Sequence, residues 1–350
     1  MRIVLAGYYG CGNVGDDALM LGLLTGLGEA PMEITALSGN PELTRRMFNV
    51  RAVPRKDPRA IKGELETTDA LVFGGGGLLQ DKTSLLSLKY YTHLIHMAKG
   101  MGKRVALIAQ GIGPIDSYLG RRATAKALAL CDLITVRDSE SLSVARSLGA
   151  KHVELTADLA WLVRPSNSPA AEFGMAGMKS VAISARPWKN AKRIAEAFGG
   201  FSQTLFKRGY IPVPVEMDRG MDTKILDQIA KLHGGRCPDI RNVSSPADMV
   251  SKLGRMNAIV SMRLHAGIFA ASAGIAPMMI AYDPKVSSFA RLLGLPIPLA
   301  VDEISAPRLW DTFQAFEDKR DAYNALVATK RDEQRTLAQR NADLLLAVLS

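Results

Sequence analysis

The sequence predicts an α/β fold made of two Rossmann-like domains that face each other across a cleft, followed by a C-terminal helical segment. The first observation is that short apolar runs alternate with segments whose apolar residues recur every three or four positions, which indicates alternating strands and helices. The second is the length, because 350 residues exceed one core of ordinary size and fit two domains. The third is a polar stretch with two prolines at 164–169, which predicts a linker.

The expected elements follow one another in order along both halves of the chain. In the first half we expect strands at 2–6, 33–37, 70–73, 105–109 and 133–136, and helices at 17–27, 86–101 and 122–130. In the second half we expect strands at 181–185, 211–215, 258–260 and 278–281, and helices at 191–207, 222–232, 246–253 and 264–273. The highly charged region 306–349 has a helical pattern. The expected domains are therefore 1–165, 166–305 and a helical segment at 306–350.

The composition places the chain among folded cytoplasmic proteins. It is 47% hydrophobic and 22% charged, and no apolar run reaches the roughly 20 residues of a membrane span. The apolar start at 1–6 is too short for the h-region of a signal peptide. The three cysteines are far apart and form no CxxC pair, so we expect no disulfide framework, no metal site and a reducing compartment.

The net charge of +10 indicates anionic partners, which include phosphorylated substrates, lipid headgroups and nucleic acid. Nucleic acid is the weakest of these, because the basic residues are dispersed and aromatic residues make up only 6% of the chain. No nucleic-acid-binding signature is found either. We therefore expect a small anionic ligand or a membrane surface.

A glycine-rich loop, Gly7–Asp17, follows the first expected strand and precedes a helix, where backbone amides can approach a ligand closely. The glycines of Gly10–Gly15 match the dinucleotide spacing G-x-G-x-x-G. However, Asp16 and Asp17 lie where a pyrophosphate would meet the helix N-terminus and would repel it, so a dinucleotide site is disfavoured. For Asp16, helix capping and a catalytic use both stay open.

Two further glycine-rich segments, Gly74–Gly77 and Gln110–Pro114, are predicted to be loops at strand ends. Four consecutive glycines are costly in chain entropy, which favours close backbone approach to a ligand over a plain connector. Gln80 and Asp81 would then offer hydrogen bonds to hydroxyl groups. The pair Tyr8–Tyr9 could stack on a sugar ring or belong to the core. The three loops are expected to line one side of the cleft.

The segment Ser261–Ala270 places Arg263 and His265 two residues apart, where an apolar strand gives way to an apolar helix. In open α/β sheets, ligands collect at the carboxyl ends of strands beside helix N-termini. A fixed cation and a titratable imidazole at such a junction suggest an anionic ligand that also needs a proton. The alternative is a buried histidine next to a surface arginine.

Two more basic residues, Arg137 and Lys285, also follow expected strands. Arg137 precedes Asp138, which could cap the next helix or simply pair with this arginine at a sheet edge. For Lys285 the alternative is an ordinary surface lysine. If these strand ends point into the cleft, Arg137, Arg263, His265 and Lys285 form one strongly cationic pocket.

Five motifs, taken in order, resemble those of the polysaccharide pyruvyl transferase family, most closely its CsaB-type branch. They are GxxNxGDDA from Gly10, GGGGLLQD from Gly74, RDSES from Arg137, SMRLHAxIFA from Ser261 and YDPKV from Tyr282. Together the motifs cover most of the chain. One departure is Asp158, which is followed by leucine where the family pattern has proline, and this puts a role for Asp158 in doubt.

The resemblance implies a fold similar to GT-B glycosyltransferases, with the acceptor in the N-terminal domain and the donor in the C-terminal domain. The family moves an enolpyruvyl unit from phosphoenolpyruvate to a sugar and so makes a cyclic pyruvate ketal. CsaB-type members act on a lipid-linked disaccharide that ends in N-acetylmannosamine. Such a partner would place the protein at the cytoplasmic face of the membrane, and no cofactor or metal is implied.

The resemblance also assigns roles to individual residues. His265 is implied to be the general acid that protonates the donor methylene, and Asp16, Asp17 or Asp81 would orient or deprotonate the acceptor hydroxyl. The implied catalytic residues are His265, Arg137, Arg263 and Lys285. The implied donor-binding residues are Arg137, Arg263, Leu264, His265 and Lys285. The implied acceptor-binding residues are Tyr8, Tyr9, Asn13, Asp16, Asp17, Gly75, Gly76, Gln80 and Asp81.

Two other functions fit the same sequence. A GT-B glycosyltransferase with a nucleotide-sugar donor would use a similar two-domain architecture and cationic site. A non-catalytic protein that binds polysaccharide or a membrane surface could use the basic residues Lys330, Arg331 and Arg335, although a solvated helix face accounts for these as well. The identity of the donor and the need for His265 distinguish the three functions.

Overall fold

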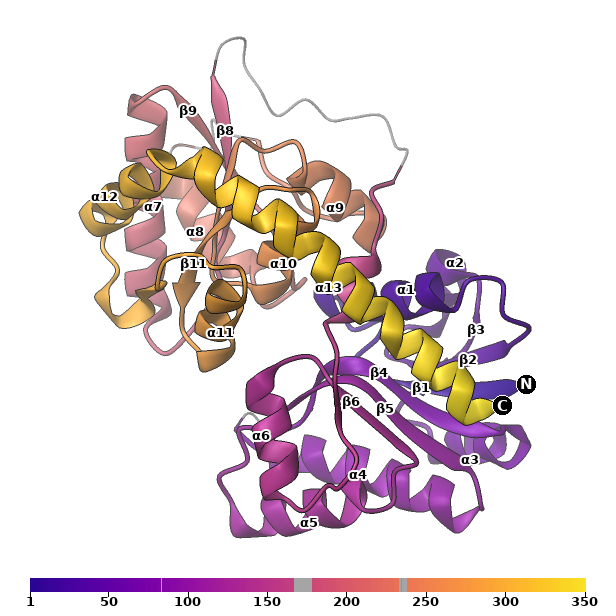
Figure 1. Cartoon of the computed structure of the whole chain (residues 1–350). Helices are drawn as coiled ribbons and strands as arrows, with labels where there is room; N and C mark the ends of the chain where they lie inside the picture. Colours follow the sequence, from indigo (N-terminus) through magenta and orange to yellow (C-terminus); the bar gives the residue numbers. More distant parts are fainter. Residues whose placement is uncertain (83, 167–177, 233, 235–237) are drawn as a thin grey trace. The chain divides into compact units, whose positions relative to one another are not determined.

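The computed structural model describes residues 1–82, 84–166, 178–232, 234 and 238–350. The chain divides into two compact units: unit 1 comprises Met1–Val163 and Gln334–Ser350, and unit 2 comprises Arg164–Glu333 (Figure 1). The division falls at the start of the stretch that we expected to be a linker, whose residues 167–169 lie outside the described ranges. The C-terminal helix contributes residues to both units.

Unit 1 is built on a seven-stranded parallel sheet with the strand order β3-β2-β1-β4-β5-β6-β7. Its strands are β1 (Arg2–Ala6), β2 (Glu33–Ser38), β3 (Arg51–Pro54), β4 (Ala70–Leu79), β5 (Arg104–Ile112), β6 (Leu133–Val136) and β7 (Glu154–Leu155). Strand β1 pairs on both sides, so Ile3 lies opposite Ile34 and Ala70. The inner strands are continuous apolar runs because helices cover both faces of the sheet.

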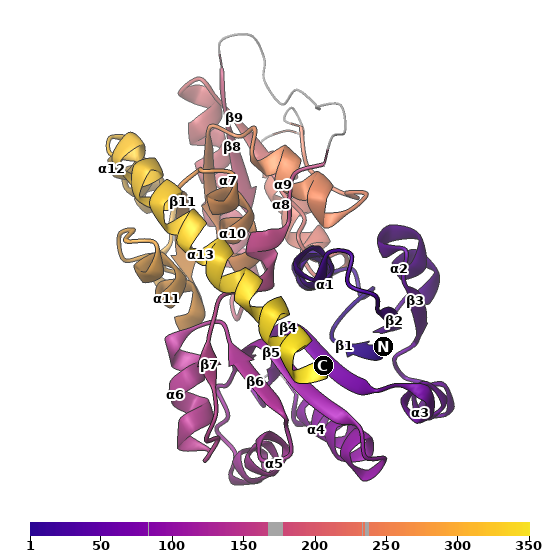
Figure 2. The same cartoon turned by 45° about the vertical axis from the view of Figure 1, so that its right-hand side comes forward.

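The helices of unit 1 form two layers. They are α1 (Val14–Leu27), α2 (Pro41–Phe48), α3 (Pro58–Thr67), α4 (Leu85–Gly100), α5 (Tyr118–Leu128), α6 (Ser139–Ser147) and the 3-10 helix η1 (Leu159–Leu162). Helices α1 and α2 lie on one face of the sheet, and α3, α4 and α5 lie on the other (Figure 2). Side-chain oxygens cap the backbone N–H groups at the starts of α1 to α6, and the capping residues are Asn13, Asn40, Asp57, Ser84, Ser117 and Asp138.

The last turns of helix α13 (Arg320–Leu349) complete the core of unit 1. Asn341 is fully buried there, and its Nδ2 donates a hydrogen bond to the carbonyl of Ala157 at 3.0 Å. Its Oδ1 accepts hydrogen bonds from the hydroxyls of Thr135 and Thr156. Satisfied buried polar groups of this kind fix the position of the helix on strand β6 and on the chain after β7.

Unit 2 is built on a five-stranded parallel sheet with the order β12-β11-β10-β8-β9. Its strands are β8 (Lys179–Ser184), β9 (Tyr210–Pro214), β10 (Ala258–Ser261), β11 (Pro277–Ala281) and β12 (Leu299–Ala300). Ser261 at the end of β10 lies opposite Ser184 of β8 and Met279 of β11. The carboxyl ends of β8, β10 and β11 therefore lie side by side.

The helices of unit 2 pack around this sheet. They are α7 (Ala191–Lys207), α8 (Thr223–Leu232), α9 (Pro246–Leu253), α10 (Leu264–Ser272), α11 (Pro284–Leu292), α12 (Ala306–Glu317), the 3-10 helix η2 (Val301–Glu303) and the first part of α13. The rings of Phe201 on α7 and Phe313 on α12 meet edge to face, with centroids 5.7 Å apart. The prediction of an α/β fold with two parallel sheets and a C-terminal helix is confirmed.

Several local predictions were wrong. The glycines of Gly74–Gly77 and the first part of Gln110–Pro114 lie inside strands β4 and β5 and not in loops, because the two strands pair with each other there, with Gly74 opposite Ile108 and Gly76 opposite Gln110. Helix α1 begins at Val14 and is capped by Asn13, so Asp16 is not its cap. The short elements α2, α3, α11, β3, β7 and β12 were not predicted, because pieces of this length show too little periodicity.

Gly22 marks the closest packing of helix α1 against η1. A Cβ at this position would lie 2.0 Å from the carbonyl oxygen of Leu159, which is backbone and cannot rotate away. Gly22→Ala is therefore expected to lower the free energy of unfolding by about 3 kcal/mol, the upper part of the usual overpacking range.

The matched control is Gly63→Ala in helix α3, where a Cβ meets nothing within 4 Å. That change should stabilise by about 0.5–1 kcal/mol, since only backbone entropy changes. Urea unfolding of both variants measures the contrast, and equal effects would contradict it.

Candidate active site

The first group of candidate residues lies where the strand order of unit 1 reverses, between β1 and β4. Ligands in open α/β sheets bind in the crevice at this point, outside the carboxyl ends of the strands. The loop between β1 and α1 lies here, and Asn13 fixes its end. The Oδ1 of Asn13 accepts hydrogen bonds from the backbone N–H of Gly15 at 2.9 Å and of Asp16 at 3.3 Å. Asn13 is thus a structural cap that sets the course of the loop.

The two tyrosines of this loop have different environments. Tyr9 is 1% exposed, and its hydroxyl donates a hydrogen bond to the carbonyl of Gly74 at 2.9 Å. A Cβ on Gly74 would lie 2.4 Å from that hydroxyl, so the glycine is needed for this contact. Tyr9 is therefore a core residue and not a stacking surface for a sugar ring. Tyr8 is 42% exposed and presents its ring at the surface, where a sugar could stack on it.

Asp17 is the most perturbed acid of the loop. It is buried, and its carboxylate accepts a hydrogen bond from the backbone N–H of Gly10 at 2.8 Å. Desolvation raises the pKa of Asp17 to about 7, with a further contribution from the neighbouring charge of Asp16. A carboxyl that titrates near neutrality is suited to exchange a proton. Asp16 is more exposed and lies close to Gly76 of strand β4.

The glycine strand β4 provides close packing and one open position. Gly75 and Gly76 have positive φ values of 84° and 93°, which other residues rarely adopt. At Gly75 a Cβ would press against Leu19 at 3.3 Å, whereas Gly77 is exposed and faces open space. Gln80 follows directly after the strand and is partly exposed. The glycines thus serve packing first, and ligand access is available at the end of the run.

The carboxylate of Asp81 is held by hydrogen bonds within unit 1. It accepts hydrogen bonds from the backbone N–H of Asp116 and of Ser117, both at 2.9 Å, and from the Ser117 hydroxyl at 2.5 Å. Desolvation opposes ionisation of Asp81, but these hydrogen bonds prevail and hold its pKa below the usual value. A stable carboxylate that already accepts three hydrogen bonds is a weaker base than Asp17.

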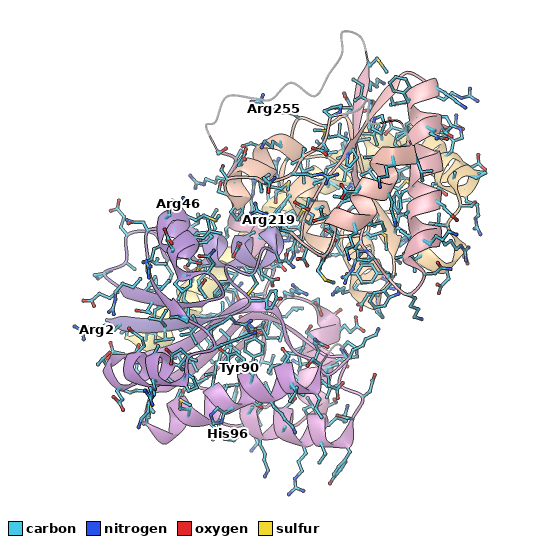
Figure 3. All side chains as sticks on the ribbon, turned by 180° about the vertical axis from the view of Figure 1, so that it is seen from behind. Arg2, Arg46, Tyr90, His96, Arg219 and Arg255 are labelled. Atoms are coloured by element: carbon cyan, nitrogen blue, oxygen red, sulfur yellow. The ribbon has the colours of Figure 1, made fainter. Side chains whose placement is uncertain are left out.

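Arg55 is a residue of this region that the sequence did not reveal. It follows β3, and its guanidinium lies over the rings of Tyr8 at 5.1 Å and Tyr90 at 5.3 Å. It also donates a hydrogen bond to the hydroxyl of Tyr91 at 2.8 Å. Tyr90 lies on the sheet side of helix α4 and His96 on its outer side (Figure 3). Arg55 was missed because the short strand β3 was not predicted, and without that strand the sequence does not place Arg55 at a strand end.

Arg137 lies at the end of β6 and is buried with acidic partners. Its Nη1 donates to the carboxylate of Asp158 at 2.8 Å, and its Nε lies 3.6 Å from Asp138. Asp158 also accepts a hydrogen bond from the backbone N–H of Ala160. Burial would lower the pKa of Arg137, but the charges of Asp158 and Asp138 raise it. The role of Asp158, in doubt from the sequence, is to neutralise this buried cation. Pairing with Asp138, the second reading of Arg137, is also present.

The second group lies in unit 2, at the carboxyl end of strand β10. Arg263 is the N-terminal flanking residue of helix α10, and its own side chain makes no capping hydrogen bond to that helix. Its Nε donates to Asp222 at 3.1 Å and its Nη2 to Asp218 at 3.3 Å, with a further short contact to Asp222. Burial would lower the pKa of Arg263, and the two carboxylates raise it. Neither Asp218 nor Asp222 was predicted as part of the site.

His265 and Lys285 lie near this arginine on neighbouring strand ends. His265 is partly buried in the first turn of α10, one residue after Leu264, with its ring 6.4 Å from that of Phe269. Lys285 is partly buried in the first turn of α11, after strand β11, and its Nζ lies 5.8 Å from the centre of the Tyr282 ring. Because β10 and β11 are paired, His265 and Lys285 belong to the same edge of the sheet.

Comparison with known protein families shows which family the chain belongs to. A model described as polysaccharide pyruvyl transferase matches residues 13–284 of the chain. The chain belongs to this family. The matched range holds Asn13, Asp17, Arg137, Arg263 and His265, so the predicted family is confirmed, while the CsaB-type branch stays a prediction. A search of the curated proteins returned no match.

The fold of this pyruvyl transferase is similar to that of several proteins of known structure. Staphylococcus aureus MnaA with UDP has a TM-score of 0.65 at 13% identity, covering 93% of this chain and 90% of its own. The UDP-GlcNAc 2-epimerase of Neisseria meningitidis bound to UDP-GlcNAc has a TM-score of 0.66 at 12% identity, covering 100% and 99%. The glycosyltransferase SnogD of Streptomyces nogalater has a TM-score of 0.59 at 16% identity, covering 100% and 99%. The transferase therefore has a GT-B-like fold.

Two further features concern possible ligands of the transferase. In the described ranges, no group of three or more His, Cys, Asp or Glu side chains is arranged to hold a metal ion. Within the same ranges, no helix combines the length and apolar character needed to cross a membrane.

Arg137 lies in unit 1, and Arg263, His265 and Lys285 lie in unit 2. Their convergence in one pocket stays a prediction.

Proposed function

We propose that this transferase moves the three-carbon unit of phosphoenolpyruvate to a glycan and forms a cyclic pyruvate ketal with release of phosphate. The observation that carries the proposal is the junction of β10 and α10, where Arg263 precedes the helix without capping it and His265 lies in the first turn. We place the donor on unit 2 and the acceptor on unit 1. The proposed acceptor is a lipid-linked cell-wall precursor that contains N-acetylmannosamine, as in the CsaB-type branch.

The charges at this edge suit the donor. Phosphoenolpyruvate carries about −2.5 to −3 charge, from one carboxylate and one phosphate. The backbone N–H groups at the start of a helix can bind such an anion, and the dipole of α10 favours it. Lys285 adds a cation in the first turn of α11. Arg137 is proposed to join them when the substrates are bound.

The proposed reaction needs one acid and one base. His265 gives its proton to the methylene carbon of the donor, and the adjacent carbon becomes an oxocarbenium-like centre. One sugar hydroxyl adds to that carbon and loses its proton to a base. The second hydroxyl then displaces phosphate at the same carbon, and its proton leaves with the phosphate or returns to His265. The double bond is consumed, two C–O bonds form and one C–O bond to phosphate breaks.

The acceptor residues of unit 1 provide the base. Asp17, whose pKa is raised to about 7 by burial, is the strongest candidate, and its neighbour Asp16 is the more exposed carboxylate. Tyr8 offers a stacking surface for a sugar ring. The net charge of +10 favours association with the anionic inner face of a membrane, where a lipid-linked acceptor would lie.

A nucleotide-sugar glycosyltransferase is the second candidate, favoured by the fold neighbours whose structures hold UDP or UDP-GlcNAc. The identity of the donor separates the two candidates, because one releases phosphate from phosphoenolpyruvate and the other consumes a UDP-sugar. A non-catalytic binding protein would do neither and would tolerate the loss of His265.

The variant His265→Gln tests the proposal. Loss of the general acid is expected to reduce phosphate release from phosphoenolpyruvate by about 10²- to 10⁴-fold, measured with a panel of lipid-linked disaccharides. Binding of phosphoenolpyruvate, followed by calorimetry, should change little, because the amide keeps the size and hydrogen-bonding capacity of the side chain. The matched control is His96→Gln, on the outer side of helix α4 in unit 1, which should leave both quantities unchanged. Turnover of His265→Gln near the wild-type rate, or consumption of a UDP-sugar by the wild type, overturns the proposal.

A further inference from the structure

Arg186 lies at the reversal point of the sheet in unit 2 and was not among the residues predicted from the sequence. Strand β8 is the first strand of this sheet, and the strand order reverses between β8 and β10. Arg186 follows the end of β8 by two residues, and Arg263 follows the end of β10 by two. Because Ser184 and Ser261 lie opposite each other, both arginines belong to the crevice where such sheets bind ligands.

Two aromatic side chains hold the guanidinium of Arg186 in place. Its Nη1 donates a hydrogen bond to the hydroxyl of Tyr282 at 2.9 Å. Its Cζ lies 4.7 Å from the centre of the Tyr282 ring and 5.6 Å from that of Trp188. The two rings also touch, with centroids 5.0 Å apart. Tyr282 follows strand β11, so this arginine is attached to the strand ends on both sides of β10.

Arg186 and Arg263 differ in whether a carboxylate compensates their positive charge. Among the residues that the structure describes, no carboxylate pairs with Arg186, and its buried Nε has no hydrogen-bond partner. Arg263, in contrast, pairs with Asp218 and Asp222, and the three groups sum to a formal charge of −1 when both acids are ionised. Positive charge at this edge therefore comes from Arg186 and from Lys285, which lies over the same Tyr282 ring at 5.8 Å.

We propose that Arg186 binds an oxyanion group of the donor, its carboxylate or its phosphate, and that Trp188 and Tyr282 hold the guanidinium ready for it. The inference rests on the proposed function. The planar fork of arginine grips such oxyanions through two parallel hydrogen bonds, which a lysine cannot reproduce. Because the aromatic rings restrict the side chain before the ligand arrives, little rotamer entropy is lost on binding. Arg263, with its charge already compensated, acts mainly to position the start of helix α10.

The test compares Arg186→Met and Arg186→Lys with a matched control. Loss of a charge-assisted contact is expected to raise the KM and the Kd for phosphoenolpyruvate about 10- to 100-fold in Arg186→Met. Arg186→Lys should fall between this variant and the wild type, because it keeps the charge and loses the fork. The control is Arg208→Met, since Arg208 lies over the ring of Trp310 at 5.6 Å, just before β9 at the amino edge of the same sheet. It should leave both constants unchanged.

The outcomes separate this inference from the proposed function. If the wild type releases phosphate from phosphoenolpyruvate and Arg186→Met does so with unchanged KM and Kd, Arg186 does not bind the donor and the function stands. If the wild type neither binds nor turns over phosphoenolpyruvate, both the function and the inference fail. A circular dichroism melt of each variant identifies a loss of binding that comes from unfolding. In that case the folded Arg186→Lys variant decides, and an unchanged KM there overturns the inference.

Discussion

Asp158→Ala is expected to lower the free energy of unfolding by about 3–5 kcal/mol, because it leaves a buried arginine without its main partner. Only 8% of the Arg137 side chain and 6% of the Asp158 side chain are exposed, and their charged atoms are 2.8 Å apart. Asp138 also forms an ion pair with Arg137, at 3.6 Å, but it is more exposed than Asp158. The alanine also removes the acceptor for the backbone N–H of Ala160 at the start of η1.

Chemical denaturation at pH 7 measures this effect against a surface pair. In Arg340 and Glu154, 54% and 50% of the side chains are exposed, and Glu154→Ala should cost less than about 1 kcal/mol. Asp158→Asn is an informative intermediate, because the amide can still accept from Ala160 while the charge is lost. A change below 1 kcal/mol in Asp158→Ala would show that water or Asp138 compensates Arg137 well enough on its own.

Asp17→Asn is expected to make the protein more stable at alkaline pH and less active. The folded pKa of Asp17 is about 7, above its ordinary value of 3.8, because burial disfavours the charged form. Ionisation of Asp17 in the folded state therefore lowers stability progressively as the pH rises from about 4 to 7. A shift of about three pKa units corresponds to about 4 kcal/mol above pH 7. Asparagine removes this penalty and can still accept the hydrogen bond from Gly10.

Thermal or urea unfolding between pH 4 and pH 8 checks the sign. The stability of Asp17→Asn should exceed that of the wild type by the full amount at pH 8 and approach it near pH 4. Asp81→Asn is the control of opposite sign, since hydrogen bonds from Ser117 and Asp116 lower the folded pKa of Asp81. That variant should be less stable than the wild type at neutral pH, with the difference fading as the pH falls towards the pKa. A wild-type protein with the same pH dependence as Asp17→Asn would contradict the buried ionisation.

The same variant bears on the reaction. If Asp17 accepts the proton of the acceptor hydroxyl, Asp17→Asn should lose about 10²- to 10⁴-fold in phosphate release. Greater stability joined with lower activity is the signature of a functional group kept in an unfavourable environment. Unchanged activity would transfer the role of base to Asp16.

Parts of the site could be predicted because they depend on local sequence. The junction at Ser261–Ala270 was recognisable because an apolar strand and an apolar helix meet there, with Arg263 between them and His265 in the first turn of the helix. The capping role of Asn13 was missed in favour of Asp16, because several residues that can cap a helix stand close together. The glycine run of β4 was taken for a loop, because strand β5, with which it pairs in the sheet, is distant in sequence.

The sequence by itself determined the alternation of strands and helices, the parallel sheets and the family, because periodicity and motif order are properties of neighbouring residues. Only the tertiary structure decided which cations are paired with a carboxylate. Asp158 is 21 residues from Arg137, and Asp222 is 41 residues from Arg263. Tyr282 is 96 residues from Arg186. Ion pairing and burial act over a few ångströms in space, so the charge at the strand ends was fixed only when the sheets had brought these distant residues together.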